Sequence, residues 1–431
     1  MDYCDEIGIC IPDILLPKDG TELEKWAVIA CDQYTSEPTY WLKVKSLVER
    51  SPSTLNMIFP EVYINQPEAN SIIDNINAAM KTYLADGTLS LHEKCIVYTE
   101  RHFEGSQVRK GLVLAVDLEK YSFSNEPDAL IRATEHTVID RLPPRIKVRK
   151  AAPLELPHVM LLIDDPDNSV IGLVEKQLEN LKKIYDFKLM LTESKIKGFK
   201  IDDAFLLSSL IEALKNLITE KQPLLFAVGD GNHSLASAKC HWDEIKGSLP
   251  IDEQKTHPGR FALVEVVNIH DPGLSILPIH RVMFNAPDLN LKQLPGVFYT
   301  QLNDSSNIEE EVYKLKKANR SSHIIGVATC KEAGIIRIDN PTFCHEAGTI
   351  DMIIEKFMLG ADGVKVDYIH GKEVVAELTK QPGNIGFYLP PLERNELFKV
   401  VCRGEILPKK TFSMGEAEQK RFYLECRKIK L

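Results

Sequence analysis

The sequence predicts an α/β or α+β protein, with a mixed sheet and flanking helices. Short apolar runs of strand length recur between turn-forming residues, as at 224–228. Between these runs lie segments whose apolar residues recur at helical spacing, as at 66–85. The pattern changes near residue 285, so we expect two regions, one over 1–285 and a C-terminal α+β domain over 286–431.

Composition excludes several classes of protein. Of the 431 residues, 44% are hydrophobic and 26% are charged, which is typical of soluble globular proteins. The formal net charge of -10 makes nucleic acid an unlikely partner, because nucleic-acid-binding surfaces are basic. The nine cysteines contain no CxxC pair, which indicates reduced thiols and argues against structural zinc. With no export signal and no apolar run of about 20 residues, we expect a cytoplasmic protein without a membrane partner.

The first candidate ligand-binding residue follows an apolar run at 26–30. Asp32 stands just after this run, and open α/β sheets bind ligands at the carboxyl ends of their strands. The alternative is that Asp32 caps the helix predicted over 40–50. Further along, 95–99 and 111–117 are predicted to form a strand pair.

The most basic window of this acidic protein lies at 127–150. Its basic residues are Arg132, Arg141, Arg145, Lys147, Arg149 and Lys150. The Pro143–Pro144 pair rules out a continuous helix, and a rigid basic segment suits phosphate oxygens. Glu135 and His136 are candidate proton-transfer groups in the same window. The alternative is a solvated basic loop that pairs with the surplus acids.

A strand-like run at 157–163 ends in three aspartates, Asp164, Asp165 and Asp167. Carboxylates at a strand end can hold Mg²⁺. We favour the alternative, in which they form a turn before a helix from about 170 to 183.

The segment 223–244 is the one around which the chain is organised. A buried strand ends in Gly229, Asp230, Gly231 and Asn232, and a helix starts at His233, with Asn232 or Asp230 as its N-cap. A helix start presents free N–H groups and a positive dipole end, which suit an anion. The alternative is an ordinary strand–turn–helix corner, and neither common nucleotide fingerprint is present.

A last candidate pair, His280 and Arg281, follows a proline. These two residue types suit an anion or a proton-transfer site, although a lone His is more often structural.

Several blocks together resemble the family called domain of unknown function 1015. GDGNHSLASA resembles its D-G-H-H-R-Y-E-T-A segment, with Asn232 for the first His and Ser234 for the Arg. IRATEHTVIDRLPPRIKVR, DPGLSILPIHR and EILPKKT resemble further blocks, in order, so the resemblance spans about 32–411. It implies a ParB-like or sulfiredoxin-like catalytic core, with N-terminal additions, within 1–285.

The resemblance also implies phosphoryl transfer to a small hydroxylated metabolite, most plausibly free L-serine, with pyrophosphate or ATP as the donor. For the proton acceptor we nominate Asp230, His233 or Glu135. Phosphate-binding candidates are Gly229, Gly231, Asn232, Arg141, Arg145, Arg149, His280 and Arg281. Mg²⁺ is expected as the cofactor, held by Asp230 or Asp32.

Two alternatives remain at this stage. The first is a nucleotide- or DNA-associated regulator without catalysis, as some ParB-like folds are. The second is a phosphohydrolase that uses the same site with water as acceptor. The oligomeric state is open, with a homodimer as one candidate.

Overall fold

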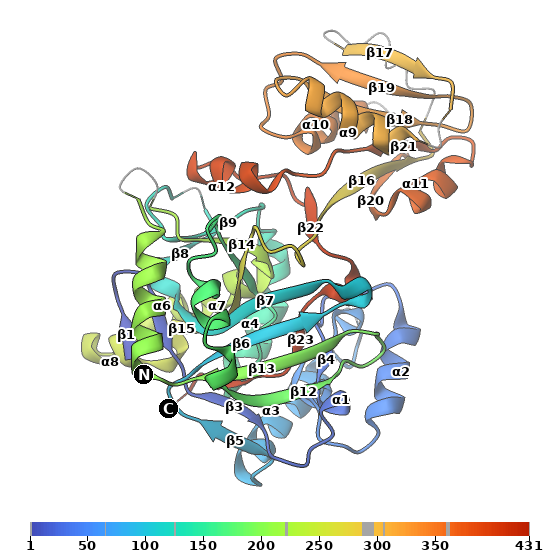
Figure 1. Ribbon diagram of the computed structural model, residues 1–431. Coiled ribbons are helices and arrows are strands. Elements are labelled where there is room, and N and C mark those ends of the chain that lie inside the picture. The colour runs from blue at the N-terminus through green and yellow to red at the C-terminus, as the bar shows by residue number, and fades with distance from the viewer. Residues whose placement is uncertain are drawn as a thin grey trace. The chain divides into compact units, whose positions relative to one another are not determined.

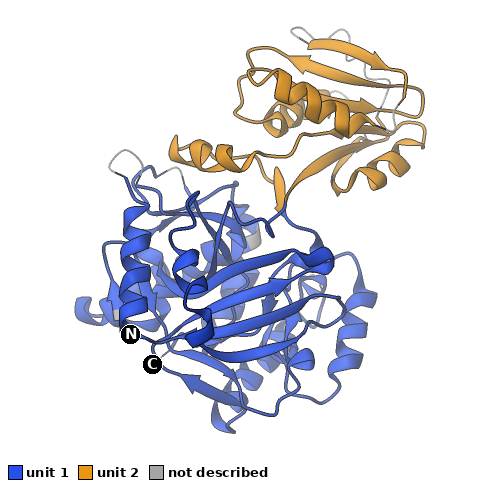
Figure 2. Ribbon diagram, viewed as in Figure 1, with its two compact units in different colours: residues 1–275, 414–431 blue, residues 276–413 orange. Residues whose placement is uncertain are grey.

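The computed structural model describes residues 2–64, 66–124, 126–219, 223–286, 297–304, 307–358 and 363–430. The chain divides into two compact units, unit 1 with 1–275 and 414–431, and unit 2 with 276–413 (Figure 2). The sequence prediction put the closing segment 414–431 with the C-terminal region. It belongs to unit 1 because its apolar residues, such as Phe422 and Leu424, are buried in the core of that unit.

Figure 1 labels helices and strands of the two units where there is room. The strands of unit 1 are β1 (Asp2–Cys4), β2 (Ile9–Ile11), β3 (Ile14–Pro17), β4 (Val28–Ile29), β5 (Leu89–His92), β6 (Ile96–His102), β7 (Val108–Asp117), β8 (Tyr121–Ser122), β9 (Ile131–Ala133), β10 (Leu154–Glu155), β11 (Met160–Ile163), β12 (Lys182–Lys188), β13 (Lys195–Ile201), β14 (Phe226–Asp230), β15 (Phe261–Asn268), β23 (Phe422–Tyr423) and β24 (Arg427–Lys428). Its helices are α1 (Leu23–Trp26), α2 (Pro38–Val48), α3 (Ala69–Ala85), α4 (Leu142–Ala151), α5 (Ile171–Glu175), α6 (Ala204–Asn216), α7 (Asn232–Lys246) and α8 (Ile251–Thr256). Unit 2 contains β16 (Ile276–Phe284), β17 (Val297–Leu302), β18 (His323–Ala328), β19 (Ala333–Ile338), β20 (Lys365–His370), β21 (Ile385–Tyr388), α9 (Ile308–Ala318), α10 (Glu346–Met358), α11 (Lys372–Thr379) and α12 (Arg394–Cys402). Strand β22 (Phe412–Met414) ends at the boundary between the units.

The main sheet of unit 1 has the strand order β12-β13-β6-β7-β15-β11-β14-β9-β8. Three neighbouring pairs, β11–β15, β14–β9 and β8–β9, are parallel, and the other pairs along this order are antiparallel. The sheet is therefore mixed, and the predicted fold class is confirmed.

Apolar residues cover both faces of this sheet. In β7, Leu112 and Leu114 face one core while Val113 faces the other, because successive side chains of a strand point to opposite faces. Helices α5, α6 and α7 contribute to the first core, and α2 and α3 to the second. A sheet buried on both faces explains why its central strands are continuous apolar runs in the sequence.

One predicted element is wrong. The helix expected over 170–183 ends early, since α5 spans only Ile171–Glu175 and β12 begins at Lys182. β12 pairs with β13 as a hairpin, and its residues Tyr185 and Phe187 pack in the second core. Aromatic residues favour a pleated surface, and here tertiary packing overrides the helical spacing.

Unit 2 is built on its own antiparallel sheet, with the order β17-β19-β18-β21-β16-β20. In β18, Ile325 packs with α10 on one face and Ile324 packs with α9 and α11 on the other. The predicted hairpin near 322–338 is confirmed as β18–β19.

Candidate functional site

The turn between β14 and α7 is shaped by two glycines. Gly231 has φ +82°, a conformation that L residues rarely adopt, and a Cβ there would lie 3.0 Å from the Cα of Val159. At Gly229, a Cβ would lie 2.8 Å from the Leu162 side chain. Both positions therefore require glycine, for close packing against the segment that contains β11.

The N-cap of α7 is Gly231, and not Asn232 or Asp230 as the sequence predicts. Gly231 has no side chain, so the N-cap residue supplies no side-chain hydrogen bond to the first turn. The Asp230 carboxylate instead accepts a hydrogen bond from the N–H of Gly231 at 3.0 Å. Asn232 is the first residue of the helix, and its Oδ1 is buried without a hydrogen-bond partner among the described residues.

The loop that follows β9 lies against this turn. β9 and β14 are parallel, with Ala133 opposite Val228, so both strands end at the same edge of the sheet. Thr134 Oγ1 donates to the carbonyl of Val228 at 2.7 Å, and the N–H of Val138 donates to Nε2 of His233 at 3.1 Å. Glu135 lies in this loop.

His233 therefore carries its ring proton on Nδ1 when it is neutral, because Nε2 is the acceptor for Val138. In this state Nε2 cannot take a proton from a substrate. The structure brings Asp230, His233 and the Glu135 loop together, and it gives His233 a positioning contact.

The buried cation of the site is Lys420, which the sequence did not indicate. Its Nζ lies 3.1 Å from Oδ2 of Asp230, with 9% of the Lys420 side chain and 23% of the Asp230 side chain exposed. Lys420 stands just before β23, which pairs with β4. This strand pairing carries the end of the chain to the β14–α7 turn.

Asp32 belongs to the same charge cluster. Burial alone would raise the pKa of its carboxyl, but the neighbouring His158 and a hydrogen bond from Gln33 oppose this. Lys420 and Arg145 act in the same direction, so the pKa of Asp32 lies below its ordinary value. Asp32 is thus an ionised carboxylate that Lys420 helps to stabilise.

His158 lies near the Asp32 carboxylate and is itself hydrogen-bonded to Tyr423. Nε2 of His158 lies 4.0 Å from Oδ2 of Asp32, and its Nδ1 lies 2.7 Å from the hydroxyl of Tyr423. That hydroxyl also lies 3.0 Å from Sγ of Cys31. Burial, with the nearby Glu61 and Asp32, raises the pKa of the Cys31 thiol, so Cys31 is not a thiolate nucleophile.

The last part of the basic window forms a helix, and three of its basic residues pair with acids. α4 begins at Leu142, and Pro143 and Pro144 occupy its first turn, where a missing N–H costs nothing. Arg145 pairs with Glu61, and Nη1 of Arg149 pairs with Glu155 at 2.7 Å. The side chain of Arg141 lies outside the described residues.

Between α4 and α7 lies a cavity of about 130 Å³. Its polar lining residues are Cys31, Glu61, Arg145, Arg149, Glu155, His158, Ser234, Ser237 and Tyr423. Nε and Nη2 of Arg149 are buried there without hydrogen-bond partners among the described residues. Unsatisfied buried guanidinium donors are suited to an anionic ligand.

His280 and Arg281 lie on β16 in unit 2, and their described contacts are within that unit. Arg281 is buried and pairs with Asp351 at 3.0 Å. Nδ1 of His280 accepts from the N–H of Leu389 at 3.1 Å, and its Nε2 lies 3.5 Å from Glu309.

The turn interpretation of the aspartate run is confirmed. Asp165 accepts hydrogen bonds from the N–H groups of Ser169 and Val170, at 2.9 and 2.8 Å, just before α5. Asp164 pairs with His270 at 2.7 Å.

The described residues contain no group of three or more His, Cys, Asp or Glu side chains arranged to hold a metal ion. Asp230 and Asp32 supply two carboxylates, and Lys420 partly neutralises both. Carboxylate oxygens are ligands of Mg²⁺, and an ion held by either residue would need further ligands.

None of the described helices combines the length and the apolar character that a membrane crossing requires.

Three comparisons relate the chain to known proteins. Residues 15–356 match the model of a family described as "Protein of unknown function (DUF1015)". No curated protein matches the sequence. Among solved structures, the chain is similar to two mutants of free serine kinase, one in complex with ADP and one with AMP.

These two similarities have 12% identity and TM-scores of 0.40 and 0.41. They cover 75% and 76% of this chain, and 94% and 95% of the kinase chains. The chain is also similar to SbnI with C-terminal truncation from Staphylococcus aureus, at 11% identity and TM-score 0.38, over 72% of this chain and 85% of that one.

Proposed function

This chain belongs to the family described as protein of unknown function (DUF1015), and from the geometry of its unit 1 we propose that it transfers a phosphoryl group to the hydroxyl of a small metabolite. The observation that carries the proposal is Lys420, a buried cation that pairs with Asp230 just before the start of α7 and lowers the pKa of Asp32. Phosphoryl transfer depends mainly on positioning and on neutralising charge. A buried cation beside a helix start supplies both.

On the donor side, three groups would hold the phosphates. These are the first-turn N–H groups of α7, the ammonium of Lys420 and the unsatisfied guanidinium donors of Arg149. Gly229 and Gly231 fix the turn that ends in this helix start, because they pack closely against the segment that contains β11. Arg145 and Arg149 both line the cavity. We leave His280 and Arg281 out of the donor site, because their described contacts stabilise unit 2.

On the acceptor side, a carboxylate would take the hydroxyl proton. Asp230, Asp32 and Glu135 are the candidates, since Nε2 of His233 is engaged by the backbone. Asp32 is supported by His158 and is kept ionised, which suits a proton acceptor. The loss of rate when each carboxylate is replaced by its amide would identify which of the three accepts the proton.

The sequence resemblance makes free L-serine the first acceptor to test, with pyrophosphate and ATP as donors. Mg²⁺ would be held by Asp230 or Asp32 together with phosphate oxygens of the donor. When bound, the ion neutralises charge on the phosphates.

The test is a screen of donors against a panel of amino acids and sugars, with phosphorylated products detected by mass. We expect one phosphorylated metabolite, and loss of its formation in Asp230→Asn at a near-normal melting temperature. Arg149→Gln should raise the KM for the donor by roughly ten- to a hundredfold, the effect of losing a charged hydrogen bond. Lys147→Gln is the matched control, because Lys147 is an exposed cation on the same helix and does not line the cavity.

Three results would reject the proposal. Release of inorganic phosphate without a phosphorylated metabolite would indicate a phosphohydrolase. A normal rate in Asp230→Asn would remove the β14–α7 turn from the reaction. If Arg149→Gln changed the KM for the acceptor and not the KM for the donor, α4 would bind the acceptor and not the donor.

A further inference from the structure

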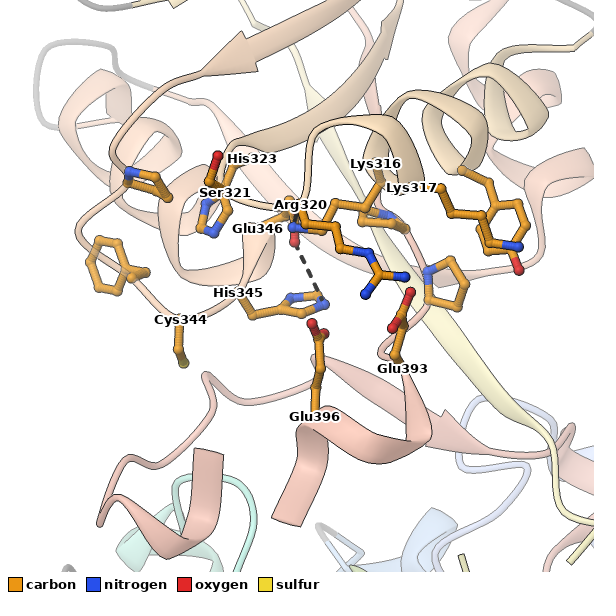
Figure 3. Close-up of a pocket in the computed structure, with 15 residues that line it drawn as sticks. Lys316, Lys317, Arg320, Ser321, His323, Cys344, His345, Glu346, Glu393 and Glu396 are labelled. Atoms are coloured by element: carbon orange, nitrogen blue, oxygen red, sulfur yellow. Dashed lines mark ion pairs between the residues drawn. The ribbon is translucent and has the colours of Figure 1, made fainter. Parts of the chain in front are cut away.

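Unit 2 contains a cavity of its own, of about 150 Å³. It is lined by the end of α9, the segment before β18, and the starts of α10 and α12 (Figure 3). Its volume is several times the roughly 30 Å³ that one water molecule occupies in the liquid. Its lining residues with charged or titratable side chains are Tyr313, Lys316, Lys317, Arg320, His323, Cys344, His345, Glu346, Glu393 and Glu396.

His345 presents an unsatisfied donor to this cavity. The side chain is buried, with 5% exposed, and its Nδ1 accepts from the N–H of Ala347 at 3.1 Å. The proton of the neutral ring is therefore on Nε2. Nε2 has no hydrogen-bond partner among the described residues, and Oε2 of Glu346 is 3.9 Å away. A buried donor without an acceptor points to a missing ligand or water.

The charges around His345 are not all paired with one another. Glu346 is neutralised by Lys316 at 2.7 Å. Among the described residues, no ion pair involves Arg320, Glu393 or Glu396. Figure 3 shows Glu393 and Glu396 extending from the start of α12 toward Arg320 and His345. The cavity thus has cationic and hydrogen-bond-donating groups on one side and carboxylates on the other.

We propose that this cavity binds a small zwitterion of the α-amino acid class. Its carboxylate would accept hydrogen bonds from Arg320 and His345, and its ammonium would donate to Glu393 and Glu396. Charge-assisted hydrogen bonds of both kinds are the strong ones. A simple anion would meet the two carboxylates, and a simple cation would meet the guanidinium, so a zwitterion matches the lining better than either. The proposal concerns unit 2 alone and does not depend on the proposed reaction of unit 1.

The test is isothermal titration of the full chain with glycine, L-alanine, L-serine and L-glutamate, and with acetate and methylamine as single-charge probes. We expect at least one amino acid to bind, and Arg320→Gln and Glu393→Gln each to weaken it by about ten- to a hundredfold. Arg320 is exposed, so its replacement leaves the fold intact. Lys314→Gln is the matched control for Arg320→Gln, since Lys314 is an exposed cation on α9 outside the cavity.

The same titrations of the Lys420→Met variant distinguish binding in this cavity from binding in unit 1. Binding by unit 2 must persist in Lys420→Met, so binding that disappears there would belong to unit 1 and overturn the proposal. No binding of any amino acid up to about 50 mM, or equal binding of acetate or methylamine, would also overturn it. So would an unchanged affinity in both Arg320→Gln and Glu393→Gln.

Discussion

The contact between Lys420 and Asp230 gives the sharpest prediction about unit 1. The two charges are 3.1 Å apart, and less than a third of either side chain is exposed. At an effective dielectric constant of about 20 the bare attraction is about 5 kcal/mol, and desolvation offsets much of it. An exposed pair would contribute about 0.2–1 kcal/mol. We therefore expect a coupling free energy of about 1–3 kcal/mol for this pair.

A double-mutant cycle measures this coupling. Lys420→Met, Asp230→Asn and the double variant are unfolded in urea, without ligands, and their free energies of unfolding are compared. The double variant should be less destabilised than the sum of the two single variants, by the coupling energy. Lys420→Met should also raise the pKa of Asp32, because Lys420 is one of the groups that lower it.

Additivity within about 0.3–0.5 kcal/mol would refute the reasoning, since that is the behaviour of independent sites. The ion pair would then contribute no more than a solvated one. An unchanged pKa of Asp32 in Lys420→Met would separately place Lys420 outside the charge cluster.

Four further predictions follow. Gly231→Ala should destabilise unit 1 by more than Gly20→Ala, because both glycines have positive φ but only at Gly231 would the new Cβ contact neighbouring backbone. The backbone strain alone costs about 1–2 kcal/mol. Equal losses of the free energy of unfolding in urea would contradict the packing argument. Burial opposes ionisation of Glu265, but Arg421 beside it lowers its pKa from the ordinary 4.5 to about 2. The contribution of ionised Glu265 to the free energy of unfolding is therefore complete above pH 4.5, and about 3 kcal/mol of it is lost as the pH falls toward 2. In Glu265→Gln, the free energy of unfolding should no longer fall by this amount over that pH range. Mg²⁺ should bind weakly alone and more tightly with a nonreactive donor analogue, and by reciprocity the donor's affinity should fall by the same factor without metal; equal Mg²⁺ affinities in calorimetry would disprove this coupling. Mild alkylation should leave activity unchanged, since burial keeps Cys31 protonated, and an inactivation that substrate prevents would show the opposite.

The sequence by itself determined the local elements, because their signals are local. The strand and glycine turn before α7 follow from an apolar run and from positions where only glycine fits, and both are confirmed at Gly229 and Gly231. The mixed α/β class follows from the alternation of strand-length runs with helical spacing. The helix predicted to Lys183 failed because β12 gains more from pairing with β13 than from local helix propensity.

Only the tertiary structure decided which groups meet. Lys420, His158 and Asp32 come from segments far apart in the chain, and no spacing in the sequence links them. The tail that carries Lys420 is placed by the pairing of β23 with β4 and by the burial of its apolar residues in the second core of unit 1. The same holds in unit 2, where His345 and Glu393 line one cavity. Contacts of this kind depend on how the sheets pack, and packing is a property of the whole chain and not of a local pattern.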